Sequence, residues 1–109
     1  MQLELTTWER IMLFQIVGGL RGPVALIRNA GKLLDILELR DEDAEQIGLV
    51  ITDRGVVHWR NQERTWQIVI DDRNLATLLT NAVKGFEGWQ PGDVKRIEAL
   101  LAKLGIEGI

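Results

Sequence analysis

The sequence predicts a single α+β domain, residues 1–109, with three N-terminal helices, a three-stranded antiparallel β-meander and two C-terminal helices. Three observations carry this prediction. A chain of 109 residues suits one domain with one core. Its 46% hydrophobic and 27% charged residues are typical of a globular protein. Helical apolar spacing occupies both ends of the chain, and β-rich runs separated by short turn sequences occupy the middle.

The first predicted helix begins at a capping box in TTWE. There Thr6 can accept a hydrogen bond from the amide of Glu9, while the Glu9 side chain reaches back to the cap. The helix continues through IMLFQIV to the glycine pair 18–19, and its apolar side chains fall on nearly its whole circumference. Such a helix is central in a core or shared with a second subunit, so we expect a homo-oligomer.

Two more helices are expected before the strands. Pro23 suits the first position of a helix that runs to about Leu39. An acidic third helix, RDEDAEQIG, has Asp41 as its expected N-cap and Gly48 as its end. The carboxylates near its start favour the positive end of the helix dipole.

Three β-rich runs, LVIT, VVHWR and TWQIVI, predict the meander because DRG and NQER separate them as turns. If Arg60 faces Thr65 across the second turn, Trp59 faces Trp66 and both rings pack inward. The cations Arg60 and Arg64 would then lie near the turn, where they are free to meet a partner.

The last third of the chain predicts two helices. One aspartate of the pair 71–72 caps the first, which ends at Gly85, and the second ends at Gly105. Between them, Phe86 and Trp89 add apolar surface for self-association.

Residue types that are missing restrict the chemistry. The chain has no cysteine, serine or tyrosine, which excludes thiolate and serine nucleophiles. One histidine, His58, cannot build a structural zinc site. The acidic run 41–45 lacks the alternating ligands of a calcium loop, and the glycine pairs lack a phosphate-loop or dinucleotide pattern. We therefore expect a non-enzymatic protein with no metal and no cofactor.

Charge restricts the partners. A formal net charge of −3 argues against duplex DNA, which attracts proteins through Lys and Arg. Three helices followed by a hairpin resemble a winged helix, whose third helix enters the major groove, but here that helix carries carboxylates. A winged-helix-like transcriptional regulator is therefore the alternative function. The apolar run IMLFQIVGGL is shorter than the ~20 residues that cross a bilayer, so we expect a cytoplasmic protein without a membrane span.

Cations of the second helix and of the predicted hairpin are the candidate residues for binding a ligand or partner: Arg21, Arg28, Lys32, His58, Arg60 and Arg64. The first three could form an anion-binding surface beside a helix N-terminus, and a solvated polar face is the simpler explanation of them. An exposed strand histidine is likewise the simpler interpretation of His58. The sequence leaves open which of the two groups carries the site.

Several segments resemble a family of small uncharacterised phage and prophage proteins: LTTWERIMLFQIVGG, LIRNAGKLL, DEDAEQIGL, VVHW and TWQIVI. The pattern of that family opens LT-x-x-ER with an apolar helix, continues through an acidic helix and a tryptophan-bearing strand, and closes with a helix. The resemblance implies a virus-encoded accessory protein in a host bacterial cell and supplies no catalytic residue. We thus predict a small binding protein of the counter-defence type, which sequesters or inhibits a host protein or an anionic nucleotide-type signal.

Overall fold

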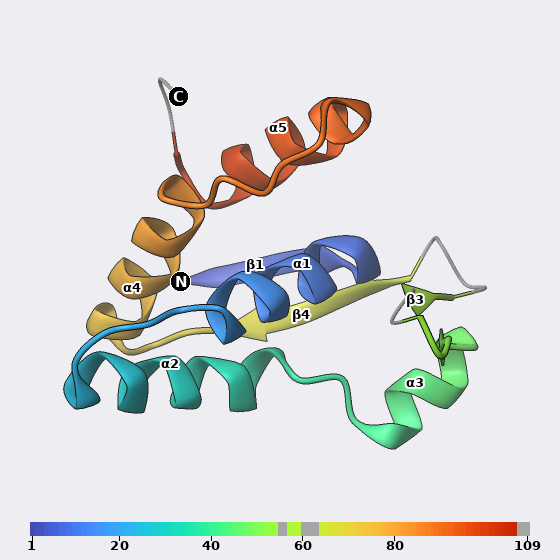
Figure 1. The fold of residues 1–109 in the computed structure, drawn as a ribbon, viewed down its shortest axis with the longest axis horizontal. Coiled ribbons are helices and arrows are strands. Elements are labelled where there is room, and N and C mark those ends of the chain that lie inside the picture. Colours follow the sequence, from blue (N-terminus) through green and yellow to red (C-terminus); the bar gives the residue numbers. More distant parts are fainter. Residues whose placement is uncertain (55–56, 60–63, 107–109) are drawn as a thin grey trace.

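The computed structural model describes residues 1–54, 57–59 and 64–106. The strands in this part are β1 (Gln2–Thr6), β2 (Val50–Ile51), β3 (Val57–His58) and β4 (Thr65–Val69). The helices are α1 (Thr7–Gly18), α2 (Val24–Leu37), α3 (Asp41–Ile47), α4 (Arg73–Lys84) and α5 (Val94–Lys103), with a 3-10 turn η1 (Pro91–Asp93) before α5 (Figure 1). The predicted α+β class is confirmed.

The predicted three-stranded meander is wrong. The described residues form two separate two-stranded antiparallel sheets, β1 with β4 and β2 with β3. Trp66 lies opposite Leu5 of β1 and not opposite Trp59. The expected order of three N-terminal helices is also wrong, because β1 precedes them. The winged-helix order is lost with the meander, since the partner of β4 is the N-terminal strand.

The pairing of β1 with β4 follows from two matching alternations. In β1 the side chains of Leu3 and Leu5 are buried and their neighbours are more exposed, and β4 has the same pattern at Trp66 and Ile68. Leu3 lies opposite Ile68 and Leu5 opposite Trp66. Joining the strands therefore places all four apolar side chains on one face of the sheet, which a hairpin between β3 and β4 would not do.

Most helix boundaries agree with the sequence signals. The capping box is present, with the Glu9 amide donating to Thr6 Oγ1 at 3.2 Å and the Thr6 amide donating to Glu9 Oε1 at 2.9 Å. Asp72 caps α4, and Gly48 ends α3 with a left-handed φ of 66°. The predicted extension of α2 to Leu39 is too long, because the helix ends at Leu37.

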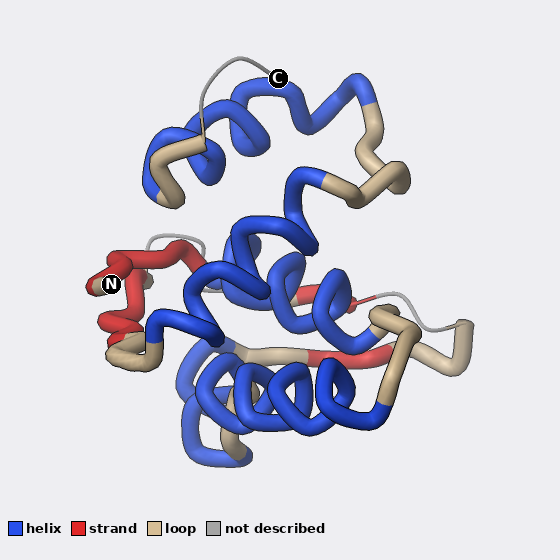
Figure 2. The backbone as a smooth tube through the Cα atoms, turned by 90° about the vertical axis from the view of Figure 1, so that its left-hand side faces the viewer, coloured by secondary structure: helices blue, strands red, loops and turns tan. Residues whose placement is uncertain are grey.

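Helix α1 lies in the middle of the molecule, where α2, α4 and β1 pack around it (Figures 1 and 2). Leu13, Ile16 and Val17 of α1 are buried in the core. Packing inside one chain thus covers much of the apolar circumference that had suggested a second subunit. Phe86 and Trp89 also pack on this core, with their rings edge to face and the ring centroids 4.9 Å apart.

Candidate functional site

The start of α1 connects three parts of the fold through its polar side chains. Buried Thr7 accepts a hydrogen bond of 3.1 Å from the indole nitrogen of Trp66 on β4. Glu9 is only 2% exposed and lies 2.5 Å from the ammonium group of Lys103 on α5. A buried carboxylate is expensive without partners, and Glu9 has two, the capped amide of Thr6 and this cation.

Arg10, the next residue, closes the far end of α2. It is 7% exposed, and its Nε and Nη2 donate to the carbonyl oxygens of Leu37 and Glu38 at 2.8 and 2.7 Å. The last carbonyls of a helix lack partners within it, and they lie at the negative end of the helix dipole. A guanidinium group supplies hydrogen-bond donors for these carbonyls and a positive charge for the negative end of the dipole. Arg10 therefore fixes the chain where it leaves α2.

Charged groups of both signs act on Arg10. Burial lowers the pKa of Arg10 below its usual value, Asp43 opposes this shift, and Arg40 and Arg64 add to it. Two guanidinium groups lie over the ring of Trp66, that of Arg10 at 4.9 Å from the centroid and that of Arg64 at 4.0 Å. Cation–π contacts thus hold both arginines against the same buried ring.

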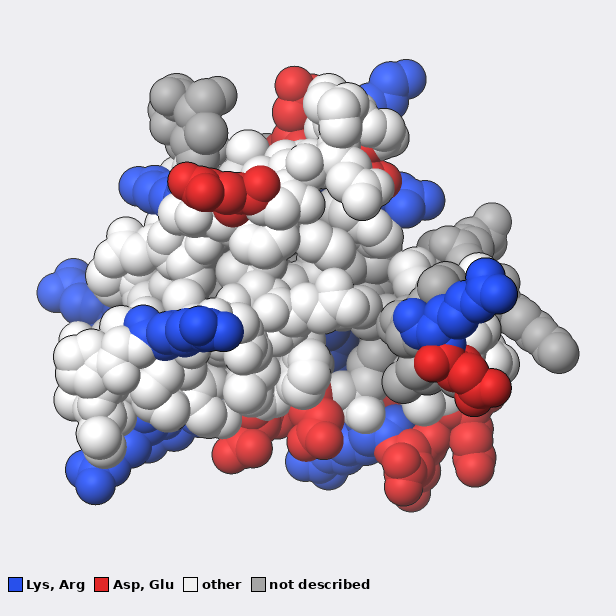
Figure 3. Space-filling view, viewed as in Figure 1, with Lys and Arg blue, Asp and Glu red and all other residues white. Residues whose placement is uncertain are grey.

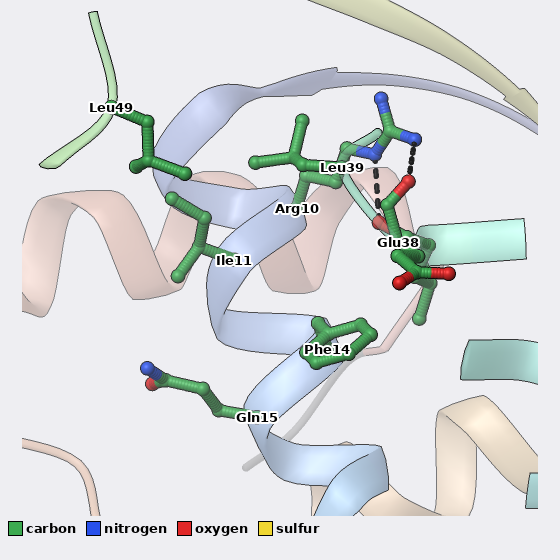
Figure 4. Close-up of a pocket in the computed structure, with 8 residues that line it drawn as sticks. Arg10, Ile11, Phe14, Gln15, Glu38, Leu39 and Leu49 are labelled. Atoms are coloured by element: carbon green, nitrogen blue, oxygen red, sulfur yellow. Dashed lines mark hydrogen bonds between the residues drawn. The ribbon is translucent and has the colours of Figure 1, made fainter. Parts of the chain in front are cut away.

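An apolar pocket of about 300 Å³ opens between α1 and the segment that follows α2. It is lined by Arg10, Ile11, Phe14, Gln15, Leu37, Glu38, Leu39 and Leu49. In the close-up, Ile11, Phe14 and Leu39 surround the hollow, and Leu49 closes it from the segment after α3 (Figure 4). The bonds from Arg10 to Leu37 and Glu38 form one wall, so the same arginine shapes the pocket.

A second, polar hollow of about 530 Å³ lies on the other side of Arg10 and Glu38, which line both. Three residues of β4 form one border, Gln67, Ile68 and Val69. The opposite border runs from the end of α2 into α3 and carries Asp35, Ile36, Arg40, Glu42 and Asp43. We call this the acidic hollow.

On the face drawn in Figure 3, most of the Lys, Arg, Asp and Glu side chains of the described residues lie toward the edge, and uncharged side chains make up most of the centre. Acidic groups lie along the edge formed by the end of α2 and by α3. Phe14, which lines the apolar pocket, has 37% of its surface exposed. Depletion of charge at the centre and a polar rim are features of surfaces that bind another protein.

The structure does not bring the predicted cations into one site. Arg21, Arg28 and Lys32 are exposed, and within the described residues they make no hydrogen bond or ion pair. His58 is exposed on β3, and Arg60 lies outside the described residues. Of the predicted residues that the structure describes, none lines the apolar pocket or the acidic hollow.

Arg64 is placed differently from the expectation of a freely projecting cation. Besides its contact with the ring of Trp66, it donates a hydrogen bond to the side chain of Gln46 on α3. Trp59 also departs from the expectation, since it lines a separate small hollow with Trp8, near the start of α1 and α5. The prediction that the two rings face one another is therefore wrong: Trp66 contacts Thr7 and Arg10 of α1, and Trp59 lines a hollow with residues of α1 and α5.

Sequence reasoning missed Arg10 and the acidic hollow. The residues WER by themselves predict an ordinary helix start, where charged side chains are usually solvated. Burial of Glu9 and Arg10 depends on Lys103 and Leu37, which lie far along the chain. One signal was available: alternation in QLELT predicts a strand ahead of the helix, which would have placed the helix start inside the fold.

Within the described residues, no group of three or more His, Cys, Asp or Glu side chains is arranged to hold a metal ion. In the same part of the chain, no helix combines the length and the apolar character needed to cross a bilayer. No protein family, curated protein or solved structure matches this chain.

Proposed function

We propose that this is a small non-enzymatic binding protein and that the apolar pocket receives an apolar side chain of a partner protein. The observation that carries the proposal is the lining of the pocket, in which apolar side chains predominate: Ile11, Phe14, Leu37, Leu39 and Leu49. A volume of about 300 Å³ accommodates one or two large side chains such as Leu, Phe or Trp.

The lining of the pocket favours a protein over an anionic small molecule. Arg10, the one cation among the described lining residues, already donates to two carbonyl groups, and Glu38 adds a negative charge. A nucleotide would need unpaired cations or backbone amides for its phosphates. The acidic α3 beside the pocket likewise repels the phosphates of duplex DNA, so a transcriptional regulator is the weaker proposal.

The resemblance to phage and prophage proteins supplies the biological setting of the proposal. A virus-encoded protein of this size acts on its host most simply by occupying a surface that a host protein needs. We therefore propose a bacterial host protein as the partner and inhibition of that protein, as in counter-defence, as the result.

Three immobilised proteins test the proposal in a bacterial lysate. Phe14→Asp places a charge at the mouth of the pocket, and Val24→Asp places the same charge on α2 at an apolar side chain that is 66% exposed. We expect a host protein to be retained by the wild type and by Val24→Asp but lost with Phe14→Asp. Mass spectrometry identifies it, and calorimetry with the purified partner should then show binding at least about tenfold weaker for Phe14→Asp.

Circular dichroism of both variants establishes that they fold. A partner that binds Phe14→Asp as tightly as the wild type would contradict the proposal. Self-association over the same face is the competing use of the pocket. Light scattering at micromolar concentration separates the two, since a dimer that Phe14→Asp converts to a monomer would assign the pocket to a second copy.

A further inference from the structure

We infer that the outer edge of β4 accepts an extended, basic segment of a partner protein as an added strand. This inference goes beyond the proposed function and does not depend on it. The groups that carry it belong to β4 and to the acidic hollow, which shares only Arg10 and Glu38 with the apolar pocket among the described residues.

The register of β1 and β4 leaves one row of backbone groups of β4 directed outward. Met1 and Ile70 exchange two backbone hydrogen bonds of 2.8 Å each, so they form a bonded pair. Bonded and non-bonded pairs alternate along an antiparallel ladder, and the next bonded pair on β4 is therefore at Ile68. The N–H and C=O groups of Gln67 and Val69 consequently point away from β1.

These outward groups have no partner in the described part of the chain. No backbone or side-chain hydrogen bond of these residues reaches Gln67 or Val69 from the side away from β1. The acidic hollow, about 530 Å³ in volume, adjoins the same stretch of β4. An unpaired strand edge beside an open hollow is the geometry in which an extended peptide adds to a sheet.

The charge of the hollow selects the occupant. Four carboxylates line it, those of Asp35, Glu38, Glu42 and Asp43. Ion pairs within 4.0 Å in the described residues are Lys103 with Glu9 and Arg96 with Asp93, so none of the four carboxylates has one. Two arginines, Arg10 and Arg40, also line the hollow. The guanidinium of Arg10 already donates hydrogen bonds to two carbonyl groups. The hollow therefore has an excess of negative charge that a cationic segment would neutralise.

The same charge disfavours other occupants. A second copy of this chain paired edge to edge along β4 would bring two acidic hollows together, and like charges at short range repel. Nucleic acids and nucleotides are negatively charged, so the carboxylates of the hollow would repel them. A basic polypeptide has both features that the edge requires, backbone groups for Gln67 and Val69 and cations for the carboxylates.

Strand geometry also defines the pattern of the segment. Successive side chains of an added strand point to opposite faces of the sheet. Those on the face of buried Ile68 would be directed toward the acidic hollow, and those on the other face would lie beside Val69, which is 47% exposed. The expected motif has Lys or Arg at every second position and β-branched residues between them.

A synthetic peptide, Thr-Lys-Val-Lys-Val-Lys-Thr with blocked ends, tests this pattern on the full chain at low salt. We expect binding by titration calorimetry and slower amide hydrogen exchange at Gln67 and Val69 when the peptide is present. The same peptide with Glu in place of Lys should not bind. A Lys peptide with N-methylated backbone nitrogens at the positions facing β4 should bind at least about tenfold more weakly, because it keeps the charge but loses the donors.

Two double variants separate the hollow from general acidity. Asp35→Asn/Glu42→Gln removes two charges of the lining that the apolar pocket does not share, and we expect binding at least about tenfold weaker. Asp41→Asn/Glu45→Gln removes two charges of the same helix region outside the lining and should change affinity less than about twofold. None of the substituted side chains is buried, so we expect both variants to fold, and circular dichroism checks this.

Three results would overturn the inference: no binding of the Lys peptide, equal binding of the N-methylated peptide, or binding without slower exchange at Gln67 and Val69. None of these results bears on the apolar pocket. Conversely, Phe14→Asp should leave peptide binding unchanged, so the two proposals fail or succeed separately.

Discussion

Arg10 and Trp66 are in contact at the centre of the fold, with the guanidinium carbon of Arg10 4.9 Å from the centroid of the indole ring. The same guanidinium donates to the carbonyl groups of Leu37 and Glu38. One side chain of α1 therefore holds β4 and the end of α2 together, and it forms the wall between the apolar pocket and the acidic hollow.

Arg10→Ala should destabilise the protein by about 3 kcal/mol, because two carbonyl groups lose a charged donor in a buried place. Arg96→Ala is the matched control: this arginine also lies over a tryptophan ring, that of Trp8, at 5.5 Å, but its side chain is 57% exposed. Its loss should cost less than about 1 kcal/mol. Urea unfolding followed by circular dichroism gives both values, and equal costs would contradict the role assigned to Arg10.

The hydrogen bond between Thr7 and Trp66 should be measurable as a coupling. Thr7→Val keeps the shape of the side chain but leaves the indole N–H without its acceptor, at a cost of about 1–3 kcal/mol. In Trp66→Phe the donor is absent, so Thr7→Val should cost clearly less in that background. A double-mutant cycle from denaturant unfolding gives the difference. Additive costs would show that the two side chains do not interact in solution.

The pairing of β1 with β4 predicts that the N-terminal strand is essential for stability. Leu5 is fully buried, so Leu5→Ala should cost about 2–5 kcal/mol. Gln2→Ala, an exposed change in the same strand, should lie within about 0.5 kcal/mol of the wild type. Thermal and urea unfolding measure both variants. A stable protein after loss of residues 1–5 would contradict this topology.

Glu9 and Lys103 should contribute unequally although they form one ion pair. Lys103→Met leaves the buried carboxylate of Glu9 without its cation, so we expect a loss of about 3 kcal/mol. Glu9→Ala removes the acceptor of the Thr6 amide and of the Lys103 ammonium group, and with it the second half of the capping box. It should cost about 1–2 kcal/mol. Unfolding midpoints in urea rank the two variants, and the reverse order would contradict this account.

Local structure was largely predictable from the sequence. The capping box at Thr6, the cap at Asp72 and the ends of α3 and α4 at Gly48 and Gly85 follow from neighbouring residues, because caps involve backbone groups within one turn. The α+β class follows from the apolar periodicity of each segment in the same way. These features need no knowledge of distant parts of the chain.

Tertiary structure alone decided which strands pair and which charges are buried. The sequence offers TWQIV two neighbours, the nearby run that contains Trp59 and the distant QLELT, and the second is used because it places four apolar side chains on one face. Burial of Glu9 and Arg10 then follows from residues 27 to 94 positions away that supply their partners. Such partners are matched by packing in three dimensions, so no local pattern in TTWER could reveal the junction or the two hollows beside it.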